Sequence, residues 1–157
     1  MVNEELIVWN PLKQNPFSRF DNELHFVEMH YQKDFVLVFE DIKFSKKYKF
    51  TYKQDEHVNY PIITFRFFDE MTRPDIEELI SKVEKKRDEE GLSKLTYEPT
   101  FYKVRNSRFL SWYDSIYPAR VGIQPNAEHH IYISSEYILE VLSEQEPIIT
   151  IDIFSTK

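Results

Sequence analysis

The sequence of 157 residues contains no cysteine and only 2 glycines. Without cysteine, the chain can form neither a disulfide nor a thiolate nucleophile. With so little glycine it cannot build the loop that cradles phosphate groups, and no GxxxxGK[ST], GxGxxG, HExxH or GxSxG motif occurs. The sequence therefore predicts no cofactor, no bound metal and no catalytic residue.

Long hydrophobic runs are missing as well. No apolar run approaches the roughly 20 residues that a membrane-spanning helix requires, and residues 1–14 lack the basic and apolar regions of a signal peptide. The absence of cysteine is typical of a reducing compartment. We therefore expect a cytoplasmic protein that does not associate with membranes.

Aromatic residues, by contrast, are abundant, with 13 Phe, 10 Tyr and 2 Trp. They favour β-strands and bury large areas, which predicts a β-rich core. The chain has the length of one domain, spanning residues 1–157. Its net charge of −7 argues against nucleic-acid binding as the main activity, because phosphate neutralisation supplies most of that affinity, and it permits a basic partner protein.

Alternation of apolar and polar residues predicts an antiparallel sheet. The expected strands are 5–9, 24–31, 35–39, 42–53, 61–68, 119–123, 129–133 and 148–154. In the clearest of them the even positions, from Ile42 and Phe44 to Tyr52, are apolar except for Lys46, while the odd positions are polar. We expect 35–39 to lie centrally in the sheet and 61–68 to pair with 42–53.

Helical spacing predicts three helices. The long one begins with a capping box at Thr72 and Asp75, carries an apolar stripe and ends at Gly91. A short helix capped by Ser107 ends before Pro118, and another follows Ser134 and Ser135. The stripe of the long helix is Ile76, Leu79, Ile80 and Val83, and the last helix directs Ile138, Val141 and Leu142 inward. The predicted fold is α+β, an antiparallel sheet of about six to eight strands with one long and two short helices.

The aromatic helix after Ser107 is the candidate surface for a partner. Trp and Tyr dominate interface hot spots, and arginines flank this helix. The residues predicted to bind a partner are Trp112, Tyr113, Tyr117, Arg120, Glu128 and His129. Core packing explains the helical spacing of the aromatic residues equally well.

Two alternatives rest on other residues. A hydrolytic enzyme would use His129 or His130 with Glu128, although adjacent strand residues face opposite ways and cannot share one site. Packing of these histidines against hydrogen-bonded neighbours is the simpler explanation. A nucleic-acid binder would use the lysines within 43–53, but their aromatic neighbours point to the other face.

The segment from His129 to Ile149 resembles the closing strand–helix–strand of small bacterial immunity-type proteins, which neutralise toxins. The resemblance implies an inhibitor without enzymatic activity that binds a toxin domain through an acidic or aromatic surface. Our first hypothesis is therefore a binding or inhibitor protein, of immunity type or phage-encoded, whose partner is another protein. Enzymatic hydrolysis and nucleic-acid binding are the alternatives.

Overall fold

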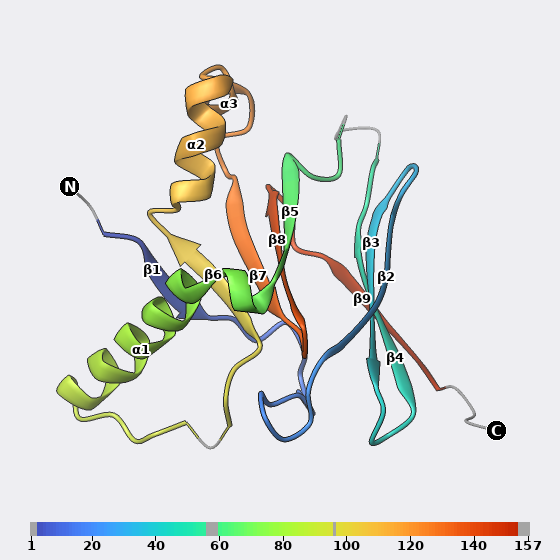
Figure 1. Ribbon diagram of the computed structural model, residues 1–157. Coiled ribbons are helices and arrows are strands. Elements are labelled where there is room, and N and C mark those ends of the chain that lie inside the picture. The colour runs from blue at the N-terminus through green and yellow to red at the C-terminus, as the bar shows by residue number, and fades with distance from the viewer. Residues whose placement is uncertain (1–2, 56–59, 96, 154–157) are drawn as a thin grey trace.

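Two antiparallel sheets packed face to face form the centre of the molecule (Figure 1). The computed structural model describes residues 3–55, 60–95 and 97–153. The five-stranded sheet contains, in spatial order, β1 (Glu5–Val8), β6 (Phe101–Arg105), β7 (Glu128–Ile133), β8 (Tyr137–Ser143) and β5 (Thr64–Asp69). The four-stranded sheet contains β2 (His25–Tyr31), β3 (Phe35–Asp41), β4 (Lys46–Tyr52) and β9 (Ile148–Ile153). The predicted α+β class is confirmed, with the strands divided between two sheets.

Aromatic side chains fill the space between the sheets. The ring of Phe39 on β3 stacks on that of Tyr132 on β7, with centroids 5.6 Å apart. The ring of Phe50 on β4 lies 5.6 Å from that of Phe101 on β6. All four side chains are buried. Because each aromatic ring buries about 150–250 Å², this layer supplies a large part of the hydrophobic stabilisation.

The predicted alternation in β4 is confirmed from Tyr48 onward, but the start of the strand was wrong. Tyr48 and Tyr52 are buried, whereas Lys49 between them lies on the other face. Residues 42–45 form a turn instead, in which the amide of Phe44 donates to the carboxylate of Asp41 at 3.1 Å. This side-chain-to-backbone bond reverses the chain, and it leaves Phe44 53% exposed.

The pairing of the strands also differs in part from the prediction. β3 lies between β2 and β4 and is buried along most of its length, as expected. However, β5 pairs with β8 in the other sheet, and β9 takes the free edge of β4. The side chain of Arg66 on β5 faces Glu140, its partner in the β8 register, and the two form an ion pair across these strands.

The long helix α1 (Pro74–Glu89) covers the outer face of the five-stranded sheet (Figure 1). It buries its apolar stripe there, as predicted, and Gly91 adopts the left-handed conformation, with φ of 70°, that ends the helix. The predicted capping box was wrong. Thr72 belongs to a 3₁₀ turn, η1 (Glu70–Thr72), in which its hydroxyl donates to the carbonyl of Asp69, and Arg73 takes the N-cap position.

Two short helices follow β6: α2 (Arg108–Ile116) and α3 (Arg120–Ile123). The hydroxyl of Ser107 accepts a hydrogen bond from the amide of Leu110 at 3.0 Å, so the predicted cap of α2 is confirmed. The strand predicted over 119–123 was wrong. The amide of Ile123 donates to the carbonyl of Ala119, which closes a helical turn.

The helix predicted after Ser134 and Ser135 was also wrong, because this segment is the β7–β8 turn followed by β8. The hydroxyl of Ser134 bonds both the amide and the carbonyl of Tyr137 and so closes a hairpin. The last predicted strand is confirmed as β9 up to Ile153, and Phe154 lies outside the described residues. None of the helices in the described part of the chain is long and apolar enough to span a membrane.

Candidate functional site

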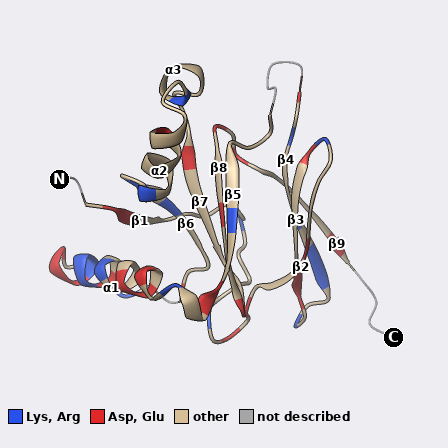
Figure 2. Cartoon of the chain, turned by 45° about the horizontal axis from the view of Figure 1, so that its top comes forward, with Lys and Arg blue, Asp and Glu red and all other residues tan. Residues whose placement is uncertain are grey.

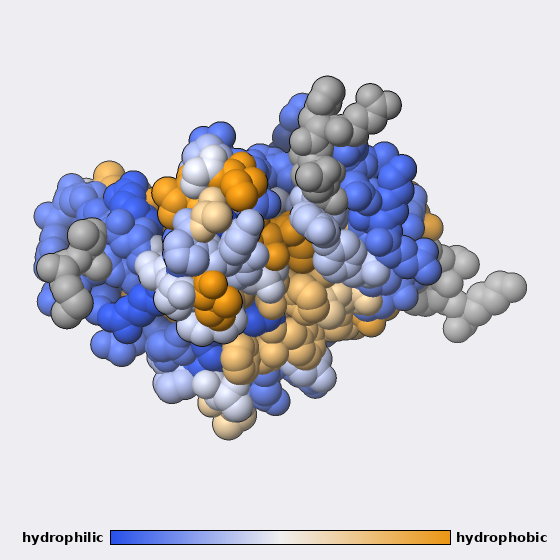
Figure 3. Space-filling view, turned by 90° about the horizontal axis from the view of Figure 1, so that it is seen from above, coloured by the Kyte–Doolittle hydropathy of each residue, from blue (hydrophilic) through white to orange (hydrophobic). Residues whose placement is uncertain are grey.

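A helical arm projects from one end of the five-stranded sheet (Figure 1). We call residues 107–124, which comprise α2, α3 and their connection, the arm. Its exposed large apolar side chains are Trp112, Ile116, Tyr117, Val121 and Ile123, with exposed fractions from 43% to 64%. In the view from above (Figure 3), separate hydrophobic groups lie among paler residues on the arm, and few of the arm's residues are charged (Figure 2). The arm therefore presents apolar surface to solvent.

Arg120 holds the two helices of the arm together. Its guanidinium group donates to both carboxylate oxygens of Asp114, at 2.7 and 2.5 Å, and to the carbonyl of Gln124 at 3.0 Å. The hydrogen bond from Arg120 lowers the pKa of Asp114, so this pair remains charged. A bidentate guanidinium fixes orientation as well as distance. The side chain of Arg120 is buried and stiffens the arm, and its predicted contact with a partner stays a prediction.

The root of the arm is anchored by Ser107 and Phe109. The hydroxyl of Ser107, which caps α2, lies 2.7 Å from Nδ1 of His129 on β7. The guanidinium carbon of Arg66 lies 4.1 Å from the centroid of the buried Phe109 ring, and this ring meets the His129 ring edge-on. These contacts fix α2 on the sheet.

Glu140 on β8 is the centre of the network beneath this root. Its carboxylate is fully buried and accepts hydrogen bonds from Arg66, at 2.5 and 2.8 Å, and from Nε2 of His129 at 2.9 Å. Arg73, at the start of α1, donates to the same carboxylate at 2.5 Å. The network therefore ties α1 and the root of the arm to three strands of one sheet.

Burial and hydrogen bonding act in opposite directions on the pKa of Glu140. Burial disfavours its charged form, but the hydrogen bonds from His129, Arg66 and Arg73 outweigh burial and hold its pKa below the ordinary value. Burial also lowers the pKa of His129, so its imidazole is neutral at pH 7. Because an ionised carboxylate only accepts, Nε2 carries the proton and Nδ1 accepts from the hydroxyl of Ser107. The three side chains form a directed chain of hydrogen bonds.

His130 points to the opposite face of β7, into the aromatic core. Its Nδ1 lies 2.7 Å from the hydroxyl of Tyr52, its ring stacks on that of Trp9, and its Nε2 lies 3.2 Å from the carboxylate of Glu128. The prediction that His129 and His130 cannot serve one site is confirmed. Both are buried and hydrogen-bonded to neighbours.

Glu128, His130 and Glu146 form the one group in the described part of the chain whose ligand atoms lie close enough for a metal, within 4.8 Å of one another. The ammonium group of Lys103 already binds both carboxylates, with 3.1 Å to that of Glu128. Hydrogen bonds from His130 and Lys103 outweigh burial and lower the pKa of Glu128 to about 2. The positive charge between these carboxylates is therefore supplied by Lys103.

The predicted partner-binding residues lie in different environments in the structure. Trp112 and Tyr117 are exposed on the arm, and Tyr113 is half-buried beside them. His129 is buried beneath the arm, so it reaches a partner only through the residues above it. Half-buried Glu128 lies on the other face of β7, bonded to His130.

Sequence reasoning missed two parts of this region. Val121 and Ile123 were assigned to a strand, although they lie exposed on α3. The network was missed because its members come from distant segments. One signal existed, since Glu140 interrupts an apolar run, and a charge at a core position requires partners.

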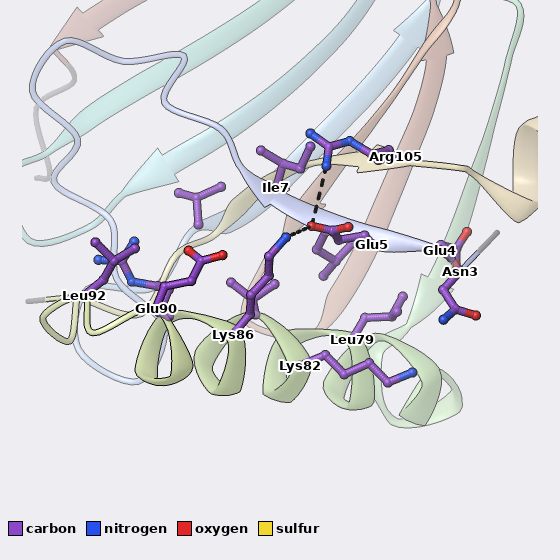
Figure 4. A pocket seen from close by; sticks show the side chains of 14 residues that line it. Asn3, Glu4, Glu5, Ile7, Leu79, Lys82, Lys86, Glu90, Leu92 and Arg105 are labelled. Atoms are coloured by element: carbon purple, nitrogen blue, oxygen red, sulfur yellow. Dashed lines mark hydrogen bonds and ion pairs between the residues drawn. The ribbon is translucent and has the colours of Figure 1, made fainter.

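A groove of about 510 Å³ lies between β1 and α1 (Figure 4). Its walls include Ile7 and Leu79, and the carboxylate of Glu5 projects into it. This carboxylate lies 2.8 Å from the ammonium group of Lys86 and 3.7 Å from the guanidinium group of Arg105. The charged groups of Glu5, Lys86 and Arg105 therefore bind one another within the groove.

The lysine-rich strand β4 keeps its aromatic side chains away from solvent. Tyr48 and Tyr52 point into the core, whereas Lys47 and Lys49 lie on the outer face of the sheet. Stacking of bases on these rings, which strong single-strand binding uses, is therefore blocked on this strand. The predicted opposition of lysines and aromatic residues is confirmed.

The segment that carries the resemblance to immunity-type proteins folds as three successive strands, β7, β8 and β9. The predicted strand–helix–strand is therefore wrong in its central element, and an immunity-type identity stays a prediction. Comparisons of the chain with protein-family models, with curated protein sequences and with solved structures found no match.

Proposed function

We propose that the protein acts by binding another protein through the exposed apolar face of the arm. The observation that carries this proposal is that five large apolar side chains of the arm are exposed, while the fold uses only its root. Exposed apolar patches on soluble proteins mark interaction sites. Trp and Tyr are enriched among interface hot spots, and the arm exposes Trp112 and Tyr117.

The shape and charge of the arm define its partner. The arm projects from the sheet (Figure 1), so its complement is an apolar groove on a different protein, because two projecting arms would bury little of each other's surface. Asp114 and Arg120 neutralise each other, and at the root the exposed side chain of Arg108 lies near the carboxylate of Glu4, which accepts from the amide of Arg108 at 2.7 Å. The expected partner therefore has a hydrophobic groove, a helix-in-groove arrangement.

Site-specific photocrosslinking tests this proposal. A photoreactive residue replaces Tyr117 on the arm or, as the matched control, Tyr31 on β2, which has the same exposed fraction of 43%. The proposal expects a discrete crosslinked protein from position 117 alone. That protein, once purified, should bind the wild type about 30-fold or more tightly than Trp112→Ala or Ile116→Ser, as for hot-spot residues.

Three results would contradict the proposal. These are equal crosslinking from positions 117 and 31, unchanged affinity of both variants, and a dimer of this chain that either variant dissociates in light scattering. The melting temperatures of both variants should match the wild type, because exposed residues contribute little to stability. A large decrease would show that the side chains serve the fold.

A second candidate function, ester or amide hydrolysis, is favoured by the chain Ser107–His129–Glu140. The order nucleophile, base and carboxylate is that of acyl-transfer enzymes. A cavity of about 420 Å³ is lined by Ser107, His129 and Asn106, among others. Of the two histidines considered with Glu128, His130 bonds that carboxylate, whereas the carboxylate that bonds the His129 imidazole is that of Glu140.

In this candidate the hydroxyl of Ser107 attacks an acyl carbon while Nδ1 of His129 accepts its proton. The imidazolium then returns the proton to the departing alkoxide or amine, and water hydrolyses the acyl–serine ester. Two arginines already neutralise Glu140, so it stabilises the imidazolium less than an unpaired carboxylate would. For this reason we rank hydrolysis second.

Labelling with a fluorophosphonate probe tests the candidate. Ser107→Asn keeps a side chain that caps α2 but removes the nucleophile, whereas Ser107→Ala removes both. Hydrolysis requires that wild-type Ser107 becomes labelled and that both variants lose labelling and turnover of p-nitrophenyl acetate. Absence of labelling in the folded wild type would rule out Ser107 as a nucleophile.

A further inference from the structure

A tight turn at the end of the molecule opposite the arm holds Phe20 in an unusual position. The amide of Ser18 donates to the carbonyl of Asn22 at 3.0 Å, and Phe20 lies at the tip between them with φ of 70°. Bulky side chains rarely adopt this left-handed conformation. The ring is also 76% exposed, so neither local preference nor burial explains a phenylalanine at this tip.

The surroundings of Phe20 are negatively charged. Glu23, Glu70 and Phe20 line a cavity together with Arg19. Burial raises the pKa of Glu70, and the nearby carboxylates of Glu77, Glu23 and Asp69 raise it further against the opposing effect of Arg19. The guanidinium group of Arg19 is paired with Glu77 and covers the Phe20 ring at 4.9 Å. Acidic groups thus outnumber bases around this turn.

An unpaired hydroxyl marks the inner wall of the same cavity. Thr100 lines it and is only 1% exposed, and its Oγ1 has no hydrogen-bond partner among the described residues. A buried hydroxyl without a partner is unfavourable by about 1–3 kcal/mol, which favours a ligand that supplies one. The cavity measures about 30 Å³, close to the volume of one water molecule and large enough for an ammonium group.

We propose that this cavity binds the ammonium group of a lysine side chain from a basic segment of a partner protein. Its three N–H donors match the carboxylates of Glu23 and Glu70 and the hydroxyl of Thr100. The aromatic ring of Phe20 provides a surface for the lysine methylenes. The site lies away from the arm and stands independently of the function proposed for it.

The experiment uses the full chain and three blocked peptides, acetyl-GSLKLSG-amide, the same peptide with Nε-acetyllysine, and the same peptide with arginine. Binding is followed by ¹⁵N NMR titration and calorimetry. The lysine peptide should shift the amide signals of Phe20, Glu23, Glu70 and Thr100. The acetylated peptide should not bind, and the arginine peptide should bind about fivefold or more weakly, because a guanidinium group exceeds the cavity.

Variants separate binding from folding. Phe20→Gly relieves the backbone strain and Thr100→Val removes the unpaired hydroxyl, so both variants should keep or raise the melting temperature. Both should bind the lysine peptide about fivefold or more weakly than the wild type does. Met71→Ala is the control, because Met71 is 86% exposed beside Glu70 but does not line the cavity. It should bind as the wild type does.

The proposal is overturned if the acetylated or arginine peptide binds as tightly as the lysine peptide, since binding would then not depend on a lysine ammonium group. It is also overturned if Phe20→Gly and Thr100→Val bind with unchanged affinity. A decrease in melting temperature for both variants, with unchanged affinity, would assign these residues to the fold.

Discussion

The helices α1 and α2 carry the same kind of apolar stripe and use it in opposite ways. In α1, Ile76, Leu79 and Ile80 are buried against the sheet. In α2, Phe109 is buried, while Trp112 and Ile116, one and two turns further on, remain exposed. One helix completes the core, and the other leaves most of its apolar surface available.

The difference arises from what each helix meets on the sheet. Beneath α1 the outer face carries apolar side chains such as Tyr102 and Ile131, so the stripe is removed from water. Beneath the root of α2 it carries His129 and Glu140. These polar groups fix the helix by hydrogen bonds at one end and leave the rest projecting. Helical periodicity thus indicates a surface to be covered without identifying what covers it.

The largest expected effect comes from removing the charge at the polar root. Glu140→Gln leaves Arg66 and Arg73 without their buried counter-charge, and breaking a buried ion pair destabilises by about 3–5 kcal/mol. We expect the free energy of unfolding in urea to fall by about 4 kcal/mol. Glu84→Gln, on the exposed side of α1, should change it by less than about 0.5 kcal/mol. Similar values for both variants would show that the network contributes little.

Paired truncations compare the two stripes directly. Ile76→Ala on α1 removes buried methyl groups and leaves a cavity, which destabilises by about 2–5 kcal/mol, and we expect about 3. Ile116→Ala on α2 should alter stability by less than about 0.5 kcal/mol, because that side chain is 64% exposed. Urea denaturation measures both. Equal losses would contradict the division between a packed and a projecting helix.

Local patterns allowed much of this fold to be predicted. The stripe and glycine end of α1, the cap at Ser107 and the alternation through Tyr48 and Tyr52 each depend on neighbouring residues, and the structure confirms them. The prediction of a helix over 137–142 was wrong. Ile138 and Leu142 fit a helical stripe, but the residues between them are buried too. A strand covered on both faces has no period to recognise.

Long-range pairing explains why the partner of β5 and the Glu140 network were missed. Arg66 and Glu140 are 74 residues apart, and Ser107 and His129 are 22 apart. Charge and hydrogen-bonding capacity showed that each needs a partner, but tertiary structure decides which one. For the same reason the sequence pointed to Trp112 and Tyr117 as candidate contacts while it placed buried His129 among them.

The cap at the root of α2 should contribute a smaller amount than either packing or charge. Ser107→Ala removes the acceptor for the amide of Leu110 and the donor to His129, and loss of an N-cap destabilises by about 1 kcal/mol. Ser107→Asp keeps the acceptor and should recover part of this loss. Thermal unfolding with Ser111→Ala as an exposed control measures the effect. A decrease equal to that of the control would show that other contacts hold the root.

The smallest effect is expected from pH. Burial lowers the pKa of His129 in the folded protein below the unfolded value of about 6.5. As the pH falls below about 6.5, the unfolded chain therefore takes up a proton that the folded root of α2 does not, and stability decreases. Urea unfolding at pH 7.5 and 5.5 should show this loss in the wild type and in His30→Gln, whose imidazole is exposed, and a smaller loss in His129→Gln. An unchanged pH dependence in His129→Gln would mean that the folded and unfolded chains take up the proton of this imidazole alike between these pH values, so Nδ1 would not stay an acceptor for Ser107 at pH 5.5.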